Sequence, residues 1–92
     1  MNATVKINKS KIALDAIIAT AKGWGLKDKD IMVQLGESPF GKGHPKAIYI
    51  DGDVYDMYNS YAGIFAAEVA KRIGNDFYLE HYTYSILTVS EI

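Results

Sequence analysis

Residues 36–42 carry the spacing in this chain that comes closest to a known chemistry. Gly36, Gly41 and Lys42 are separated as in a phosphate-cradling loop, where backbone N–H groups and a lysine hold phosphate oxygens. Such a loop also needs a serine or threonine after the lysine and a helix immediately afterwards. Here Gly43 follows Lys42, and Pro45 leads into a strand-like run, so we do not expect a nucleotide triphosphatase.

Carboxylates and histidines form the next candidates for chemistry. Asp51, Asp53 and Asp56 could hold a hard cation, but their spacing is not that of an EF-hand loop. A strand-end turn followed by a helix cap explains the three acids, so we expect no metal site. His44 and His81 lie in no catalytic or metal-binding pattern. An enzyme would need the aspartates and one histidine to converge, and we expect a protein without catalytic residues or cofactor.

Composition limits the classes of protein that this chain can belong to. Its 92 residues are 49% hydrophobic and 23% charged, which is typical of one soluble globular domain spanning residues 1–92. The absence of cysteine excludes disulfides, thiolate nucleophiles and cysteine-based metal sites. The first residues lack the apolar run of a signal peptide, and no segment approaches the roughly 18 apolar residues of a membrane span. We therefore expect a cytoplasmic protein that does not associate with membranes.

The first half of the chain predicts a strand, a helix and a hairpin. Alternation over Val5 to Ile7 indicates a short strand, and residues 9–22 keep helical spacing after Asn8 or Ser10 as N-cap. Gly23 is expected to end this helix in the left-handed conformation. Two further strands are predicted, joined by the long glycine- and proline-containing loop from Gly36 to Lys46, and they cover residues 31–35 and 47–50.

The second half predicts one long helix and one long strand. Asp53 resembles a helix cap, after which helical spacing continues to Ile73, and Gly74-Asn75 marks the end of the helix. The stretch from Phe77 to Val89 contains aromatic and β-branched residues without glycine or proline, which favours a strand. Its alternation places five residues on one face, namely Tyr78, Glu80, Tyr82, Tyr84 and Ile86.

These elements predict an α+β fold, a small single-layer antiparallel sheet packed by two helices. The βαββαβ order is that of ferredoxin-like domains when the crossovers are right-handed. RNA-recognition domains share this order, but their aromatic signature is absent from residues 5–7 and 47–50. If residues 1–8 form no strand, the alternative is a three-stranded sheet backed by two helices.

Positive charge is concentrated in the first half of the chain. Residues 1–46 contain eight lysines against four acids, a balance of +4, whereas residues 47–92 have a balance of −5. The predicted topology brings basic residues to one end of the sheet, where they could bind phosphate on a nucleic acid or a phosphorylated small molecule. The predicted anion-binding residues are Lys9, Lys11, Lys42, His44, Lys46 and Arg72.

Aromatic residues are concentrated in the second half, because all seven tyrosines lie between Tyr49 and Tyr84. Exposed tyrosines provide rigid amphipathic area and are enriched at protein interfaces. The predicted partner-binding residues are Phe40, Tyr55, Tyr82 and Tyr84.

The sequence therefore favours a small non-enzymatic binding protein that occupies a surface of a protein partner. An inhibitor or regulator of the kind that phages and other mobile elements encode has this general character. The alternative is a binder of phosphate ligands or nucleic acid through the lysines and the loop from Gly36 to Lys46. Unpaired sheet edges also permit a homodimer.

Overall fold

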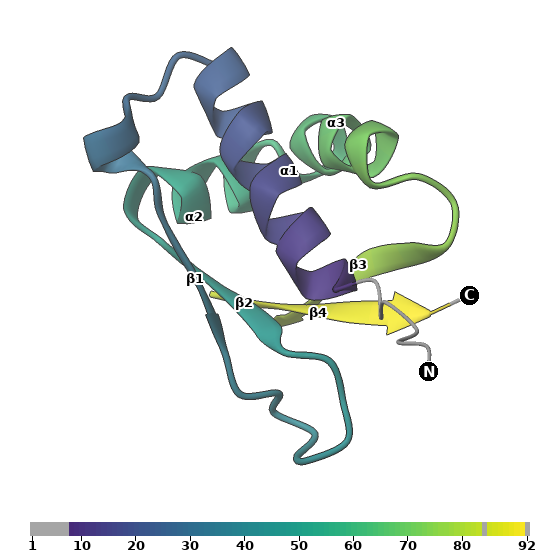
Figure 1. Ribbon diagram of the computed structural model, residues 1–92. Coiled ribbons are helices and arrows are strands. Elements are labelled where there is room, and N and C mark those ends of the chain that lie inside the picture. The colour runs from purple at the N-terminus through teal and green to yellow at the C-terminus, as the bar shows by residue number, and fades with distance from the viewer. Residues whose placement is uncertain (1–7, 84, 92) are drawn as a thin grey trace, which may run out of the picture.

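The computed structural model describes residues 8–83 and 85–91, which form three α-helices and a four-stranded antiparallel sheet. All three helices lie over one face of the sheet (Figure 1). The predicted α+β class, with a single-layer antiparallel sheet packed by helices, is confirmed. The predicted strand at residues 5–7 lies outside the described residues, so the ferredoxin-like order stays a prediction.

The sheet has the strand order β1-β2-β4-β3, and every neighbouring pair is antiparallel. In chain order the elements are α1 (Lys9–Gly23), the 3-10 turn η1 (Asp28–Asp30), β1 (Met32–Gly36), β2 (Ala47–Asp51), α2 (Gly52–Ser60), α3 (Ala62–Ile73), β3 (Phe77–Thr83) and β4 (Ile86–Glu91). The predicted hairpin of two strands around a long loop is present as β1 and β2. Among the described residues, no helix is both long enough and apolar enough to cross a bilayer.

Helix α1 begins where the sequence predicts. The Asn8 side chain accepts a hydrogen bond from the backbone N–H of Lys11 at 3.0 Å, which satisfies one free donor of the first turn. The predicted left-handed conformation of Gly23 is wrong. The helix continues through Gly23, and the positive φ of 103° belongs to Gly25 instead. Glycine suits this position because it has no Cβ to clash there.

The predicted second helix is two helices. Its N-cap is Asp51, whose side chain accepts from the N–H of Gly52, and not Asp53, which lies in the first turn. The chain leaves helical geometry at Tyr61, with φ −122° and ψ 36°, and α3 starts at the next residue. Gly74 ends α3 with a positive φ of 88°, as a C-terminal glycine does.

The predicted single strand from Phe77 to Val89 is a hairpin of β3 and β4. The two strands pair from Phe77 opposite Glu91 to Thr83 opposite Ile86, with a register irregularity between His81 and Thr83. If residues 77–89 formed one extended strand, Leu79 and Val89 could not pair with each other, because they would lie in the same strand. The fold back gives Leu79 the partner Val89 on the core side of the sheet.

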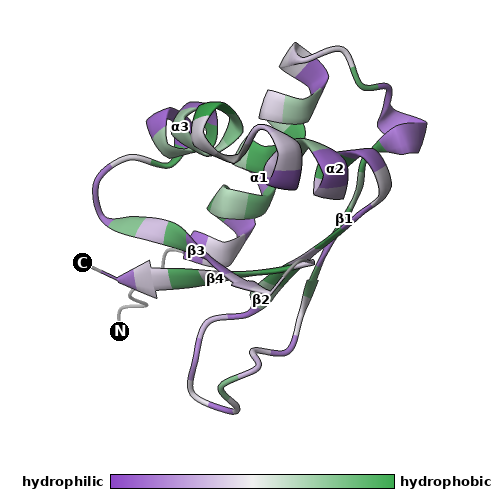
Figure 2. Cartoon of the chain, turned by 180° about the vertical axis from the view of Figure 1, so that it is seen from behind, coloured by the Kyte–Doolittle hydropathy of each residue, from purple (hydrophilic) through white to green (hydrophobic). Residues whose placement is uncertain are grey.

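The hydrophobic core lies between the helices and the sheet. Figure 2 shows hydrophobic segments on both the helices and the strands. Fully buried side chains come from every layer, and the largest are Phe65, Ile17, Ile48, Leu87, Val54 and Val69. Trp24 is only partly buried and seals one margin of the core, with its ring edge-on to Tyr61 and Phe65. The helical layer is thus fixed to the inner face of the sheet.

Candidate binding surface

The outer face of the sheet is the face that the helices leave uncovered (Figure 1). Val33 of β1, Ile48 of β2 and Leu87 of β4 belong to the core or pack against it. Because side chains alternate along a strand, the neighbours of these residues in each strand point outward. The outward residues include Met32 and Gln34 of β1, Tyr49 and Asp51 of β2, Ile86, Thr88 and Ser90 of β4, and Tyr78, Glu80 and Tyr82 of β3. This face therefore combines tyrosines with small polar residues and few charges.

Tyr49 is held flat near the centre of the outer face. Its hydroxyl donates to the backbone carbonyl of Glu37 at 2.7 Å. The ring crosses Gly36, where a Cβ would stand only 2.5 Å from the ring atom Cε1. The lack of a side chain at Gly36 therefore leaves space for the Tyr49 ring, which gives this glycine a role other than binding phosphate.

The loop of residues 37–46 reaches across this outer face. The Phe40 ring meets the Tyr82 ring of β3 edge-to-face, with centroids 5.2 Å apart, and His44 lies 5.6 Å from Phe40 on another side. Thr88 points outward but is only 6% exposed. Phe40 is 56% exposed and Tyr82 46% exposed, so the pair presents a solvent-facing aromatic surface.

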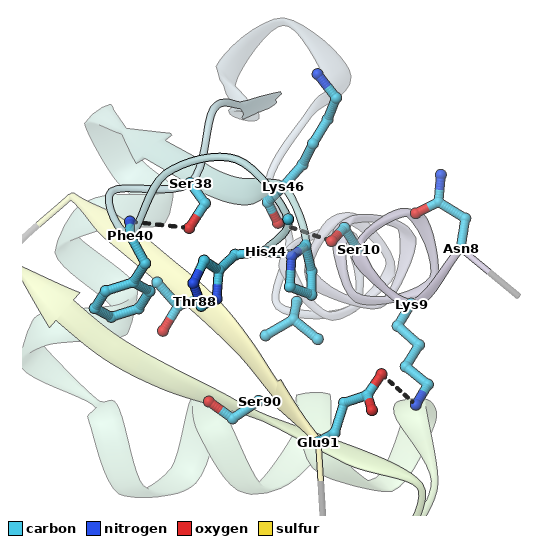
Figure 3. A pocket seen from close by; sticks show the side chains of 13 residues that line it. Asn8, Lys9, Ser10, Ser38, Phe40, His44, Lys46, Thr88, Ser90 and Glu91 are labelled. Carbon is cyan, nitrogen blue, oxygen red and sulfur yellow. Dashed lines mark hydrogen bonds and ion pairs between the residues drawn. The ribbon is translucent and has the colours of Figure 1, made fainter.

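A hollow of about 1220 Å³ lies between this loop, the N-terminus of α1 and the last residues of β4 (Figure 3). Lys9 and Glu91 form an ion pair at one end, with Nζ and Oε1 3.0 Å apart, and Phe40 stands at the other end. Lys9, His44 and Lys46 all line the hollow. The structure thus brings together three of the predicted anion-binding residues.

The lysines at this end of the molecule are largely paired with acids. Lys46 lies 3.6 Å from Glu37, and Lys11 binds both carboxylate oxygens of Asp15, at 2.7 and 2.9 Å. Lys9 pairs with Glu91 as described above. A phosphate at the hollow would have to compete with these carboxylates, so the positive potential available to it is small.

Arg72 and Lys42 are placed apart from the hollow. The Arg72 Nη2 atom lies 3.9 Å from the point where a Cβ on Gly23 would stand, so its guanidinium is beside the last turn of α1. Lys9 is in the first turn of that 15-residue helix, which at about 1.5 Å per residue separates the two ends by about 21 Å. Lys42 is exposed in the loop but does not line the hollow.

The predicted partner-binding residues are also divided between two faces. Phe40 and Tyr82 meet on the outer face, as described above. Tyr55 is half-buried on α2 and packs against the core on the helical side. Tyr84 lies outside the described residues.

Sequence reasoning did not select several exposed apolar residues. Tyr78 is 46% exposed and Met32 53% exposed on the outer face, while Ile64 and Tyr61 are exposed on the helical side. Strand alternation did place Tyr78 on the same face as Tyr82, which is the signal that could have identified it. Nothing in the local sequence around Ile64 indicates exposure, because the helical spacing continues through it.

The aspartates and histidines take structural positions. Asp51 caps α2, whereas Asp53 and Asp56 are exposed along that helix. The His81 ring lies edge-on to Tyr58. His44 lies before β2, whereas Asp51 lies at the end of that strand, four residue steps or about 13 Å beyond Ala47, so these two residues lie at opposite ends of β2. Within residues 8–83 and 85–91, no three metal-ligating side chains gather.

Comparisons of the chain with protein-family models, with curated proteins and with solved structures gave no match.

Proposed function

We propose that this chain is a small non-enzymatic binding protein that occupies a surface of a protein partner, as an inhibitor or regulator. The observation that carries the proposal is the uncovered outer face, where the Phe40 and Tyr82 rings meet while about half of each side chain is exposed. Aromatic side chains that are held rigidly lose little entropy on binding, and they are common among the residues that dominate interface energies.

The polar character of the remaining outer residues fits this proposal. Gln34 and Ser90 add polar groups to this face, as the polar rim of an interface does, and the Ser90 hydroxyl donates to Glu80 Oε1 at 2.7 Å. Nucleic acid is disfavoured, because the outward residues of the four strands include Glu80 and no lysine or arginine. A protein surface is the partner that this composition fits.

The test compares matched variants of the full chain as bait in a lysate of its own host. Phe40→Ala combined with Tyr82→Ala removes the aromatic pair, and Ile64→Ala removes an exposed apolar side chain on the helical side. We expect a stoichiometric partner to be retained by the wild type and by Ile64→Ala. The purified partner should bind the double variant at least about 30-fold more weakly, because truncating a dominant interface residue costs about 2 kcal/mol or more.

Equal retention by all three baits would contradict the proposal. Circular dichroism and thermal unfolding provide the folding control, since both substituted side chains are exposed and should leave the unfolding temperature within a few degrees of the wild type.

A further inference from the structure

Strand β1 forms one edge of the sheet, and among the described residues it has a strand neighbour on the β2 side only. Both views of the chain show β1 at the margin of the sheet (Figures 1 and 2). Edge strands are usually protected by charged residues, proline or a bulge. The sequence of β1, Met-Val-Gln-Leu-Gly, has neither charge nor proline, and its register with β2 is continuous. The opposite edge strand, β3, carries Glu80 and a register irregularity between His81 and Thr83.

The hydrogen bonds of β2 show which groups of β1 face the free side. Ile50 donates its N–H to the carbonyl of Ser85, on the β4 side of β2, at 2.9 Å. Val33 stands opposite Ile50, so these two residues form a non-hydrogen-bonded pair between β1 and β2. The same holds for Leu35, two residues further along. Val33 and Leu35 therefore direct their N–H and C=O groups away from β2, toward the free side of β1.

Helix α1 begins beside β4 and β3, away from this free side. Asn8 lines the hollow together with residues 88–91, and Lys9 Nζ lies 5.9 Å from the centre of the Phe77 ring of β3. Right-handed crossovers that start from antiparallel strands on one face move in opposite directions across a sheet. The crossover from β2 to β3 moves away from β1. The strand predicted at residues 5–7, leading through α1 to β1, would thus lie on the β2 side of β1, and topology favours a second molecule at the free side.

The free side of β1 is complementary to itself about a two-fold axis at Gln34. When two β1 strands lie antiparallel with Gln34 opposite Gln34, Val33 of each copy stands opposite Leu35 of the other. Their free N–H and C=O groups then bond in both directions, as in a regular antiparallel ladder. The inner-face side chains of Val33 and Leu35, which are only partly buried, would be covered by the same pairing.

The outer-face side chains also fit this register, which places Met32 of one copy opposite Gly36 of the other. Met32 is 53% exposed, and the Tyr49 ring crosses the space that a side chain at Gly36 would fill. Met32 thus meets a flat ring, a favourable contact for a thioether. Its Sδ atom lies 3.5 Å from the point where a Cβ on Gly52 would stand, and rotation of this unbranched side chain turns it to the free side.

We propose that the chain forms a homodimer in which the two β1 strands pair antiparallel about Gln34 and join the two sheets into one. The two-fold axis stands perpendicular to the sheet, so both outer faces point to the same side. Two Phe40–Tyr82 pairs are then presented together, and a partner with two matching sites would gain from avidity. The homodimer does not rest on the proposed function, because no residue of the aromatic pair forms it.

Cysteine cross-linking tests the dimer and its register, because the chain has no cysteine of its own. Residues opposite each other in a non-hydrogen-bonded pair have Cα atoms about 4.5 Å apart, a separation that a disulfide can bridge. Gln34→Cys should therefore give a covalent dimer on mild oxidation. Met32→Cys is the matched control on the same face of β1, because its counterpart in the second copy lies about 13 Å away along the strand. We expect at least about tenfold more cross-linked dimer from Gln34→Cys.

Sedimentation of the wild type measures the dimer without a cysteine. The dimer fraction should rise between about 10 µM and about 1 mM protein. Gln34→Lys places like charges opposite each other at the axis and should weaken the dimer about fivefold. Thr83→Lys adds the same charge at an exposed position of β3 and should dimerise as the wild type does.

Amide hydrogen exchange read by NMR shows what covers the free side of β1. We expect exchange at Val33 and Leu35 to slow as the protein concentration rises. Slow exchange there at every concentration would show that the chain itself covers this edge, and would overturn the homodimer. A wild type that stays monomeric up to about 1 mM, or equal cross-linking of the two cysteine variants, would also overturn it.

The double variant Phe40→Ala with Tyr82→Ala separates the homodimer from the proposed function. It should dimerise as the wild type does, even where it no longer captures a protein partner. Loss of the dimer in this variant would assign the contact between copies to the outer face and overturn pairing through β1. Wild-type capture by this variant, together with an intact β1 dimer, would refute only the role of the aromatic pair.

Discussion

Tyr58 is a buried residue whose ionisation is coupled to folding. Its side chain is 5% exposed and packs between the rings of Phe65 and His81, with centroids 5.5 and 5.6 Å away. Burial raises the pKa of the Tyr58 phenol above its ordinary value of 10.0, because the phenolate is poorly solvated there. The folded protein thus holds this proton more tightly than the unfolded chain does.

The stability of the protein should consequently fall as the pH rises above about 10. Below that pH the Tyr58 phenol is protonated in both the folded and the unfolded state, so its ionisation does not lower the stability of the protein. Above it, the unfolded chain releases the proton first, so the unfolded state binds fewer protons and the free energy of unfolding decreases with pH. Urea unfolding of the wild type and of Tyr58→Phe at pH about 8 and about 10.5 measures this loss.

Tyr58→Phe should lose less stability than the wild type between the two pH values, by about 1.4 kcal/mol for each unit of pKa shift that the interval covers. Tyr78→Phe, which removes an exposed hydroxyl on the outer face, is the matched control. Equal losses for the wild type and Tyr58→Phe would show that other groups cause the alkaline destabilisation.

At the scale of elements, a hydrogen bond from a buried serine joins α1 to the residue that precedes β2. Ser10 is 3% exposed, and its hydroxyl donates to the carbonyl of Lys46 at 2.7 Å. We expect Ser10→Ala to lower the free energy of unfolding by about 1 kcal/mol, since this is the usual net value of such a bond. Urea unfolding at neutral pH measures the change.

Lys11→Ala is the control for this prediction, because it lies in the same helical turn and breaks only the exposed pair with Asp15. Exposed pairs of this kind contribute about 0.3–0.5 kcal/mol. If Ser10→Ala cost no more than Lys11→Ala, the contact between Ser10 and Lys46 would not be what holds the start of β2 against α1.

Elements that depend on local signals could be predicted from the sequence. The N-cap at Asn8, the β1–β2 hairpin and the end of α3 at Gly74 follow from capping, alternation and glycine. The break at Tyr61 could not, because helical spacing is uninterrupted there and the ring of Trp24, from a distant connection, packs on Tyr61. The β3–β4 hairpin was missed because no glycine or proline marks its turn.

The candidate site was predictable only in part, because some of its contacts join residues that are distant in the sequence. The long loop and the N-terminus of α1 were expected at one end of the sheet, and Lys9, His44 and Lys46 do line one hollow. The contact of Phe40 with Tyr82 joins residues 42 positions apart, which no local pattern encodes.

At the scale of the whole molecule, the fold interleaves the charges that the sequence separates into two halves. Lys9 of the basic first half pairs with Glu91 of the acidic second half, at 3.0 Å. Within the first half, acids also lie beside lysines, as in the pairs Lys11 with Asp15 and Lys22 with Asp28. The basic half of the sequence therefore does not produce an equally basic face.

This distribution predicts weak binding of nucleic acid. Electrostatic binding of nucleic acid depends on cations that are not already neutralised, and the lysines that line the hollow, Lys9 and Lys46, lie beside Glu91 and Glu37. We expect no saturable binding of a fluorescent single-stranded DNA of about 20 nucleotides, by anisotropy at about 20 mM salt, where electrostatic binding is strongest. Saturable binding that weakens steeply with salt and is lost in Lys42→Ala combined with Lys46→Ala would contradict this expectation. That result would favour the phosphate-binding alternative over a protein partner, because the two substitutions remove charge from the loop without touching the Phe40–Tyr82 pair.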